Sequence, residues 1–232
     1  MQQLLQRKLL VLGGSGAMGS AVARAVVEAG GEPILVGRDE ARLRAAASAL
    51  GSRARTLVGD FADAGDAARL YALAGRVDHV VVALSAGGAR ASSIPATDLA
   101  GFKGAQSRLW ASYNAVHLAP RFVAPTGSLV LVSGSSGRRP GAGFGVWTAL
   151  HGGIEALARA AAIELAPIRV NVISPGGIGM RPDRQLAEHA GAPDDIAAAV
   201  LALITNPAIT NAVLDVDGGE RLGRWSGDAR AA

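Results

Sequence analysis

The first chemistry that this sequence indicates is phosphate binding at a glycine-rich turn near the N-terminus. The apolar residues 9–12 lead into Gly13, Gly14, Ser15, Gly16, Ala17, Met18 and Gly19, and a helical pattern starts there. A strand, a glycine turn and a helix together present backbone N–H groups and a helix N-terminus to a phosphate. Glycine permits positive φ and a close approach of the backbone to a ligand. An ordinary tight turn is the alternative, because this chain has 31 glycines and G-x-G-x-x-G matches arise by chance.

The elements that must position this turn alternate between strands and helices along the whole chain. Helices are predicted between the strands, and the two longest cover residues 102–123 and 144–165. This alternation predicts parallel βαβ units, and therefore an α/β fold with a doubly wound sheet. The strands are continuously apolar, as expected when helices cover both faces of the sheet. The predicted strands are residues 9–12, 33–36, 55–58, 77–84, 128–132, 168–173 and 212–216. No linker or repeat divides the chain, so we expect one domain over residues 1–223 and a loose tail over 224–232.

Composition excludes several classes of function. The chain of 232 residues has no cysteine, which rules out disulfides and cysteine zinc sites, and we expect no metal site. Its net charge is +4, but the arginines are scattered and aromatic residues make up only 4%, so no nucleic-acid footprint is present. No apolar stretch reaches the roughly 20 residues of a membrane span, and no signal peptide is recognisable. We therefore expect a soluble, cytoplasmic protein without membrane or nucleic-acid partners.

Several separated motifs together resemble the short-chain dehydrogenase/reductase family. They are the 13–19 turn, Gly59-Asp60, Ser85-Ala86-Gly87, the stretch 168–176 (IRVNVISPG) and Asp217-Gly218-Gly219. The resemblance covers nearly the whole chain. It implies a Rossmann-type sheet of about seven parallel strands that binds NAD(H) or NADP(H). It also implies a homodimer or homotetramer, since the two long predicted helices resemble those that form dimer contacts in this family.

The resemblance also implies a set of cofactor-binding residues. Gly37 stands where a carboxylate would select NAD(H), and Arg38 offers a planar fork of donors to the 2′-phosphate of NADP(H). NADP(H) is therefore the expected cofactor, and a surface arginine before the helix cap Asp39 is the alternative. Asp60 matches the adenine-contacting position, for which helix capping is the alternative. The remaining implied contacts are Gly13, Ser15, Gly16, Ala17, Met18, Gly19, Phe61, Ser85, Ala86, Gly87, His151, Pro175, Gly176 and Ile178.

The resemblance also implies that the family's catalytic groups are replaced in this chain. Trp147 stands where the family has its acid/base tyrosine, and His151 where it has its lysine. The serine position falls on Gly134, between Ser133 and Ser135, and the asparagine position falls near Arg108. Indole N–H only donates, so Trp147 cannot be the acid, whereas a histidine titrates near neutrality. The candidate catalytic residues are therefore His151, Ser133, Ser135 and Trp147; a cleft-lining histidine and loop-satisfying serines are the alternatives.

Three functions agree with this pattern. The first is an NADP(H)-dependent oxidoreductase that acts on a small carbonyl or alcohol substrate with a rearranged proton donor, either His151 or water. The second is a non-redox enzyme on the same scaffold that uses His151 as a base. The third is a catalytically inactive NADP(H)-binding sensor or partner subunit.

Overall fold

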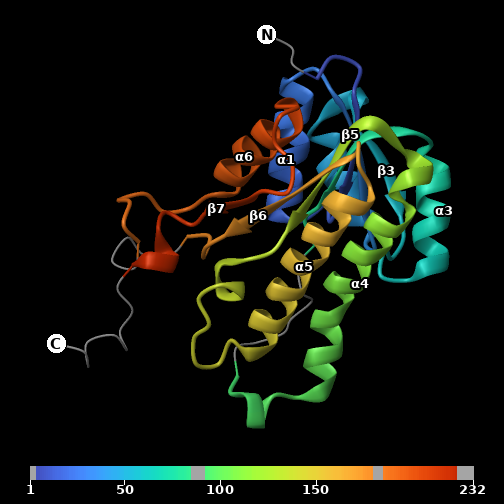
Figure 1. Cartoon of the computed structure of the whole chain (residues 1–232). Coiled ribbons are helices and arrows are strands. Elements are labelled where there is room, and N and C mark those ends of the chain that lie inside the picture. Colours follow the sequence, from blue (N-terminus) through green and yellow to red (C-terminus); the bar gives the residue numbers. More distant parts are fainter. Residues whose placement is uncertain (1–3, 85–91, 180–184, 224–232) are drawn as a thin grey trace.

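The structure is a computed structural model that describes residues 4–84, 92–179 and 185–223. Seven parallel strands form one sheet in the order β3-β2-β1-β4-β5-β6-β7 (Figure 1). The strands are β1 (Lys8–Leu12), β2 (Glu32–Gly37), β3 (Arg55–Val58), β4 (Val77–Val82), β5 (Val123–Val132), β6 (Arg169–Pro175) and β7 (Val213–Val216). The predicted α/β fold with a Rossmann-type, doubly wound parallel sheet is confirmed.

In the described part of the chain, six α-helices cover the two faces of the sheet. Helices α1 and α6 lie on one side, and α3, α4 and α5 lie on the other (Figure 1). The helices are α1 (Ala17–Glu28), α2 (Glu40–Ser48), α3 (Ala64–Ala74), α4 (Leu99–Phe122), α5 (Gly145–Glu164) and α6 (Pro193–Thr205). Within the described ranges, no helix is both long enough and apolar enough to cross a membrane.

The continuous apolar strands supply two separate cores. In β1, Leu10 and Leu12 pack beside α3, whereas Leu9 and Val11 pack beside α1. Successive side chains of a strand point to opposite faces, so a strand buried on both faces must be apolar at every position. Each fully buried leucine contributes roughly 2 kcal/mol relative to an exposed one. This burial fixes the register of β1 and therefore the place where the glycine turn begins.

Most predicted elements agree with the structure within a few residues. The largest differences are in β5, which begins at Val123 instead of residue 128, and in α4, which begins at Leu99 instead of residue 102. The loop predicted after β5 contains a short 3₁₀ turn, Ser135–Gly137 (η3). The predicted tail and the residues Ser85, Ala86 and Gly87 lie outside the described residues.

Sheet topology identifies where a ligand site can form. The chain order reverses at β1, which pairs with β2 on one side and with β4 on the other. In open α/β sheets, ligands bind beyond the carboxyl ends of the strands at such a switch point. The glycine turn follows β1 directly, and the η3 turn follows β5 at the same edge.

Candidate functional site

The glycine turn is shaped by positions that leave no room for a side chain. Gly13 has φ +82°, and a Cβ there would lie 2.6 Å from the carbonyl oxygen of Ala83. A Cβ on Gly19 would overlap the carbonyl oxygen of Gly13. Gly16 precedes α1 and no side chain caps that helix, so the first-turn amides are left to face a ligand. This backbone geometry suits the pyrophosphate of a dinucleotide.

A cavity of about 300 Å³ opens beside this turn. It is bordered by many of the predicted cofactor residues: Gly13, Ser15, Gly16, Ala17, Met18, Arg38, Asp60, Phe61 and Ile178. Two further lining residues, Arg42 and Ser107, were not predicted from the sequence. Phe61 contributes little surface, because its ring is buried and packs edge-to-face on Tyr71 at 5.2 Å between centroids.

Two arginines bring positive charge to this cavity, Arg38 directly after β2 and Arg42 on α2. Arg38 Nη1 lies 3.7 Å from Asp60 Oδ2, and the two side chains are 67% and 45% exposed. Such an exposed pair holds each partner only weakly, so Arg38 remains available to an anion. Arg42 comes from the first turn of α2, and its Nη2 donates to the carbonyl oxygen of Ser15 at 3.4 Å. Asp60 Oδ1 accepts the N–H of Ala62 at 3.0 Å in the loop before α3, whereas the helix cap weighed as its alternative role belongs to Asp63.

A second cavity, of about 220 Å³, lies at the carboxyl ends of β5 and β6. Trp147, Ser135 and His151, three of the four predicted catalytic residues, border it. The predicted nicotinamide-loop residues Pro175 and Gly176 border this cavity too, instead of the first one. Its other walls are Gly134, Ser136, Arg139, Phe144, Gly177 and Glu220.

His151 is a buried side chain of the second cavity with a contact on each ring nitrogen. It is 9% exposed, its Nδ1 lies 2.9 Å from Ser136 Oγ, and its Nε2 lies 3.3 Å from Arg108 Nη1. Burial, and secondly the charge of Arg108, lower the pKa of His151 to about 3. The expectation that this histidine titrates near neutrality is therefore wrong, because the ring is buried beside a cation and stays neutral.

The imidazole of His151 fills the space where a serine at position 134 would project. A Cβ on Gly134 would lie 2.5 Å from His151 Cε1 and 2.7 Å from its Nδ1. Gly134 has φ 175°, an extended conformation that any residue adopts, so only the histidine ring excludes a side chain there. The glycine at the family's serine position and the histidine at its lysine position are therefore sterically linked.

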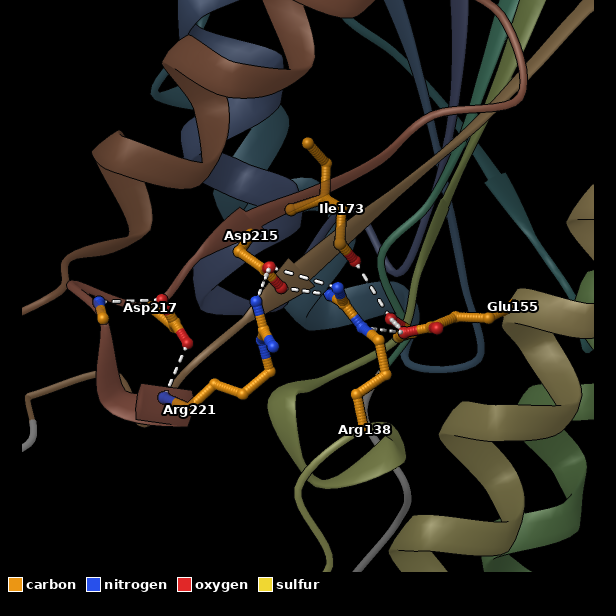
Figure 2. Close-up of polar contacts among 8 residues, drawn as sticks. Arg138, Glu155, Ile173, Asp215, Asp217 and Arg221 are labelled. Carbon is orange, nitrogen blue, oxygen red and sulfur yellow. Dashed lines mark hydrogen bonds and ion pairs between the residues drawn. The ribbon is translucent and has the colours of Figure 1, made fainter. Parts of the chain in front are cut away.

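Ser133 does not reach the second cavity. Its hydroxyl is buried and donates to Glu155 Oε1 at 3.0 Å. Figure 2 shows Arg138 between Glu155 and Asp215, with Arg138 Nε 3.3 Å from Glu155 Oε1. Ser133 thus belongs to a polar network that ties η3 to α5 and β7. The prediction that Ser133 is a catalytic residue is therefore wrong, because its hydroxyl is directed to the carboxylate of Glu155 on α5.

One signal in the sequence was available for the residues that were missed. Arg42 lies in the first turn of the helix predicted from Glu40, only four residues after the predicted phosphate contact Arg38. Ser136 stands in the same polar loop as Ser133 and Ser135, but no spacing rule distinguishes which hydroxyl faces the cavity. Among the described residues, no group of three or more His, Asp or Glu side chains is arranged to hold a metal ion.

Comparisons with known proteins agree with this architecture. A family model described as enoyl-(acyl carrier protein) reductase matches residues 14–220. The chain is a short-chain dehydrogenase/reductase. This reductase-family chain is 32% identical to the 3-oxoacyl-[acyl-carrier-protein] reductase of Bos taurus, over 91% of this chain and 97% of that protein. The chain is also 32% identical to the short-chain dehydrogenase/reductase ATR9 of Stachybotrys chlorohalonatus. That match spans 45% of this chain and about half of the relative, 49%.

A solved structure supports the same family. The short-chain dehydrogenase/reductase SDR:glucose/ribitol dehydrogenase from Brucella melitensis matches with a TM-score of 0.86 and 27% identity. The match covers 94% of this chain and 98% of that chain. The family therefore makes this protein an oxidoreductase by type, and the family's nicotinamide cofactor is implied for it.

Proposed function

We propose that this protein is an NADP(H)-dependent oxidoreductase that acts on a small carbonyl or alcohol substrate through an atypical active site. The observation that carries the cofactor choice is the pair Arg38 and Arg42 on the wall of the first cavity, beside Gly37. A carboxylate at position 37 would repel a 2′-phosphate, and glycine removes that charge. Two guanidinium groups offer planar, charge-assisted donors to a phosphate.

The residues present suit a dinucleotide along the carboxyl edge of the sheet. The glycine turn would hold the pyrophosphate, because glycine at positions 13 and 19 lets the backbone close tightly on itself and leaves the uncapped N-terminus of α1 facing the cavity. Arg38 and Arg42 would hold the 2′-phosphate, and Pro175 and Gly176 would border the nicotinamide end. When bound, the cofactor supplies hydride transfer.

The substrate end is proposed to use groups other than the family's tyrosine and lysine. Trp147 has an N–H donor but no proton to exchange at neutral pH. His151 is neutral and lies against Gly134, so it orients neighbouring groups and does not carry a charge. Loss of a positioned acid costs about 10²–10⁴-fold in rate, which slows the reaction without abolishing it.

The experiment is a fluorescence titration with NADPH and with NADH. We expect wild type to bind NADPH more tightly than NADH, and Arg38→Glu to weaken NADPH by at least about tenfold while NADH changes little. Arg44→Glu is the matched control, since Arg44 is on α2 but pairs with Glu40 and does not border the cavity. Equal losses for both cofactors, or equal effects of the two variants, would contradict the assignment of Arg38.

A second candidate, an NADP(H)-binding protein without catalysis, is favoured by Trp147 and by the neutral His151. A panel of ketones and aldehydes with NADPH distinguishes the two. Turnover supports the oxidoreductase. Tight NADPH binding together with no turnover across the panel supports the binding protein.

We also propose that the chain forms a homodimer or homotetramer through α4 and α5. Trp110 on α4 is 57% exposed, and Tyr113 beside it is half-exposed and stacks on His117. Light scattering after size-exclusion chromatography tests this. A monomer at micromolar concentration would contradict it, and Trp110→Glu should shift an oligomer toward monomer.

A further inference from the structure

A buried arginine determines which nitrogen of His151 carries the proton. Arg108 on α4 is 7% exposed, and its Nη2 donates to the carbonyl oxygen of Val132 at 3.0 Å. Its Nη1 lies 3.3 Å from His151 Nε2. A guanidinium has donors and no acceptor, so Nε2 must be the accepting nitrogen of the pair. A proton on Nε2 would instead make two N–H groups face each other.

The other nitrogen of the ring therefore carries the hydrogen. Because the ring is neutral, Nδ1 holds its only N–H and donates it to Ser136 Oγ, 2.9 Å away. The hydroxyl of Ser136 is the acceptor in this contact, and its own proton points elsewhere. Over residues 4–84, 92–179 and 185–223, the Ser136 hydroxyl has no other hydrogen-bond partner.

The hydroxyl of Ser136 stands on a turn that is held from several sides. The N–H of Gly137 donates to the carbonyl oxygen of Gly134 at 3.0 Å, which closes the turn. Two residues after Ser136, Arg138 is fastened to Asp215 and Glu155 (Figure 2). Ser136 borders the second cavity together with the apolar side chains of Phe144, Trp147 and Pro175. A fixed donor beside apolar side chains selects for a ligand atom that accepts a hydrogen bond.

We infer that Ser136 is the residue that binds the substrate's carbonyl oxygen, with its hydroxyl turned into the second cavity by His151 and Arg108. Arg108 and His151 are positioning residues in this arrangement. The ligand class is a ketone or aldehyde with an apolar flank against Trp147 and Phe144. The inference rests on the proposed function for the identity of the ligand, but the hydrogen-bond chain from Arg108 to Ser136 stands without the cofactor.

The chain of hydrogen bonds is tested by nitrogen-15 NMR of the histidine rings at pH 7 without cofactor. His151 is assigned by comparison with His151→Gln. We expect His151 Nδ1 to appear as a protonated nitrogen and Nε2 as an unprotonated one. In Arg108→Met this preference should weaken or reverse. A wild-type ring protonated on Nε2 overturns the inference, and this measurement needs no variant at Arg108 to fold.

The binding of the carbonyl oxygen is tested by kinetics on a panel of aryl and alkyl ketones with NADPH. Ser136→Ala should lower kcat/KM by about 10²-fold, as loss of one oxyanion donor does, with the Kd for NADPH unchanged. Ser136→Thr keeps a hydroxyl and should restore most of the rate. The inference is overturned if Ser136→Ala turns over like wild type, or if Ser135→Ala causes the larger loss.

These outcomes separate the inference from the proposed function. Failure of wild type to bind NADPH contradicts the proposed function, whatever tautomer His151 adopts. NADPH binding with normal turnover in Ser136→Ala contradicts only the role of Ser136. NADPH binding without turnover of any ketone in the panel contradicts the carbonyl assignment, and the tautomer then decides whether the Arg108–His151–Ser136 chain exists.

Discussion

The cavity beside the glycine turn and the cavity beside η3 share one edge of the sheet but are walled by different kinds of group. The first is shaped largely by backbone, since Gly13 lies on its wall and a Cβ on Gly13 or on Gly19 would overlap backbone atoms of the turn and of Ala83. The second is shaped by interlocked side chains, with His151 held between Gly134, Ser136 and Arg108. A site shaped by backbone keeps its shape when side chains are exchanged. In a site shaped by side chains in contact, one exchange alters the room left for its neighbours.

The largest effect is expected from a substitution that disrupts the glycine turn beside the first cavity. Gly19→Ala should lower the free energy of unfolding by about 3 kcal/mol and abolish NADPH binding, because its Cβ overlaps the carbonyl oxygen of Gly13. Gly104→Ala on α4 is the control, since nothing lies within 4 Å of its Cβ. It should stabilise the helix by roughly 0.5–1 kcal/mol. Urea denaturation measures both, and equal stability of the two variants would contradict the shape argument.

The next largest effect is expected in the second cavity, where it tests the contact between Gly134 and His151. Gly134→Ala should cost about 2 kcal/mol, because the new methyl group meets the ring of His151. In a His151→Ala background the same change should cost less than about 0.5 kcal/mol, because Gly134 is extended and tolerates a side chain. A double-mutant cycle of unfolding free energies measures the coupling. Additive effects would show that the ring does not exclude a side chain at position 134.

A third effect is the pH dependence of stability. Burial lowers the pKa of His151 to about 3 and that of His79, which is also buried, to about 4, against 6.5 for an exposed histidine. Below pH 6.5 the unfolded chain binds protons that the folded chain does not, so the stability present above pH 6.5 is lost as pH falls. Each histidine should contribute a slope of about 1 kcal/mol per pH unit between pH 6.5 and 4.5.

Single variants show how much each histidine contributes to this slope of stability against pH. His151→Gln and His79→Gln should each remove about half of it, measured by urea denaturation across that pH range. An unchanged slope in His151→Gln would mean that the ring is protonated in the folded state. His79 lies on β4, away from both cavities, so its pKa reports burial and the nearby charges of Asp78, Arg169 and Arg7 instead of contacts in the second cavity.

The smallest expected effect concerns Arg42, a charged residue of the first cavity that was not predicted from the sequence. Arg42→Gln should weaken NADPH by about fivefold, equivalent to about 1 kcal/mol, and leave NADH unchanged. Arg42 already contacts the carbonyl oxygen of Ser15, so only part of its donor capacity is available to a phosphate. Isothermal titration with both cofactors measures the difference. A larger loss than in Arg38→Glu would reverse the assigned order of the two arginines.

Sequence reasoning reached the fold and the first cavity because both depend on local patterns. Continuous apolar strands and a glycine turn have short-range signatures, and nine predicted cofactor residues border that cavity. The second cavity depends on contacts between distant residues. Position 108 was noted only as the place of a missing asparagine, yet 43 residues separate Arg108 from the histidine that it orients.

The serines after β5 show most directly what the sequence alone does not predict. Alternation along a strand predicts that neighbouring side chains diverge, but it does not say which one faces the ligand. Ser133 faces inward to Glu155, and Ser136 reaches the cavity because η3 turns the chain. The pKa of His151 was misjudged for a related reason, since no local pattern announces that the ring will be buried beside Arg108.

The contact between Gly134 and His151 also has a consequence for redesign of the second cavity. Serine at position 134 does not fit beside the histidine in its present place, because its Cβ would lie 2.5 Å from Cε1 of the ring. An exchange at position 151 alone would leave glycine at position 134, without a hydroxyl. A variant that restores the family's serine and lysine must therefore change both positions together.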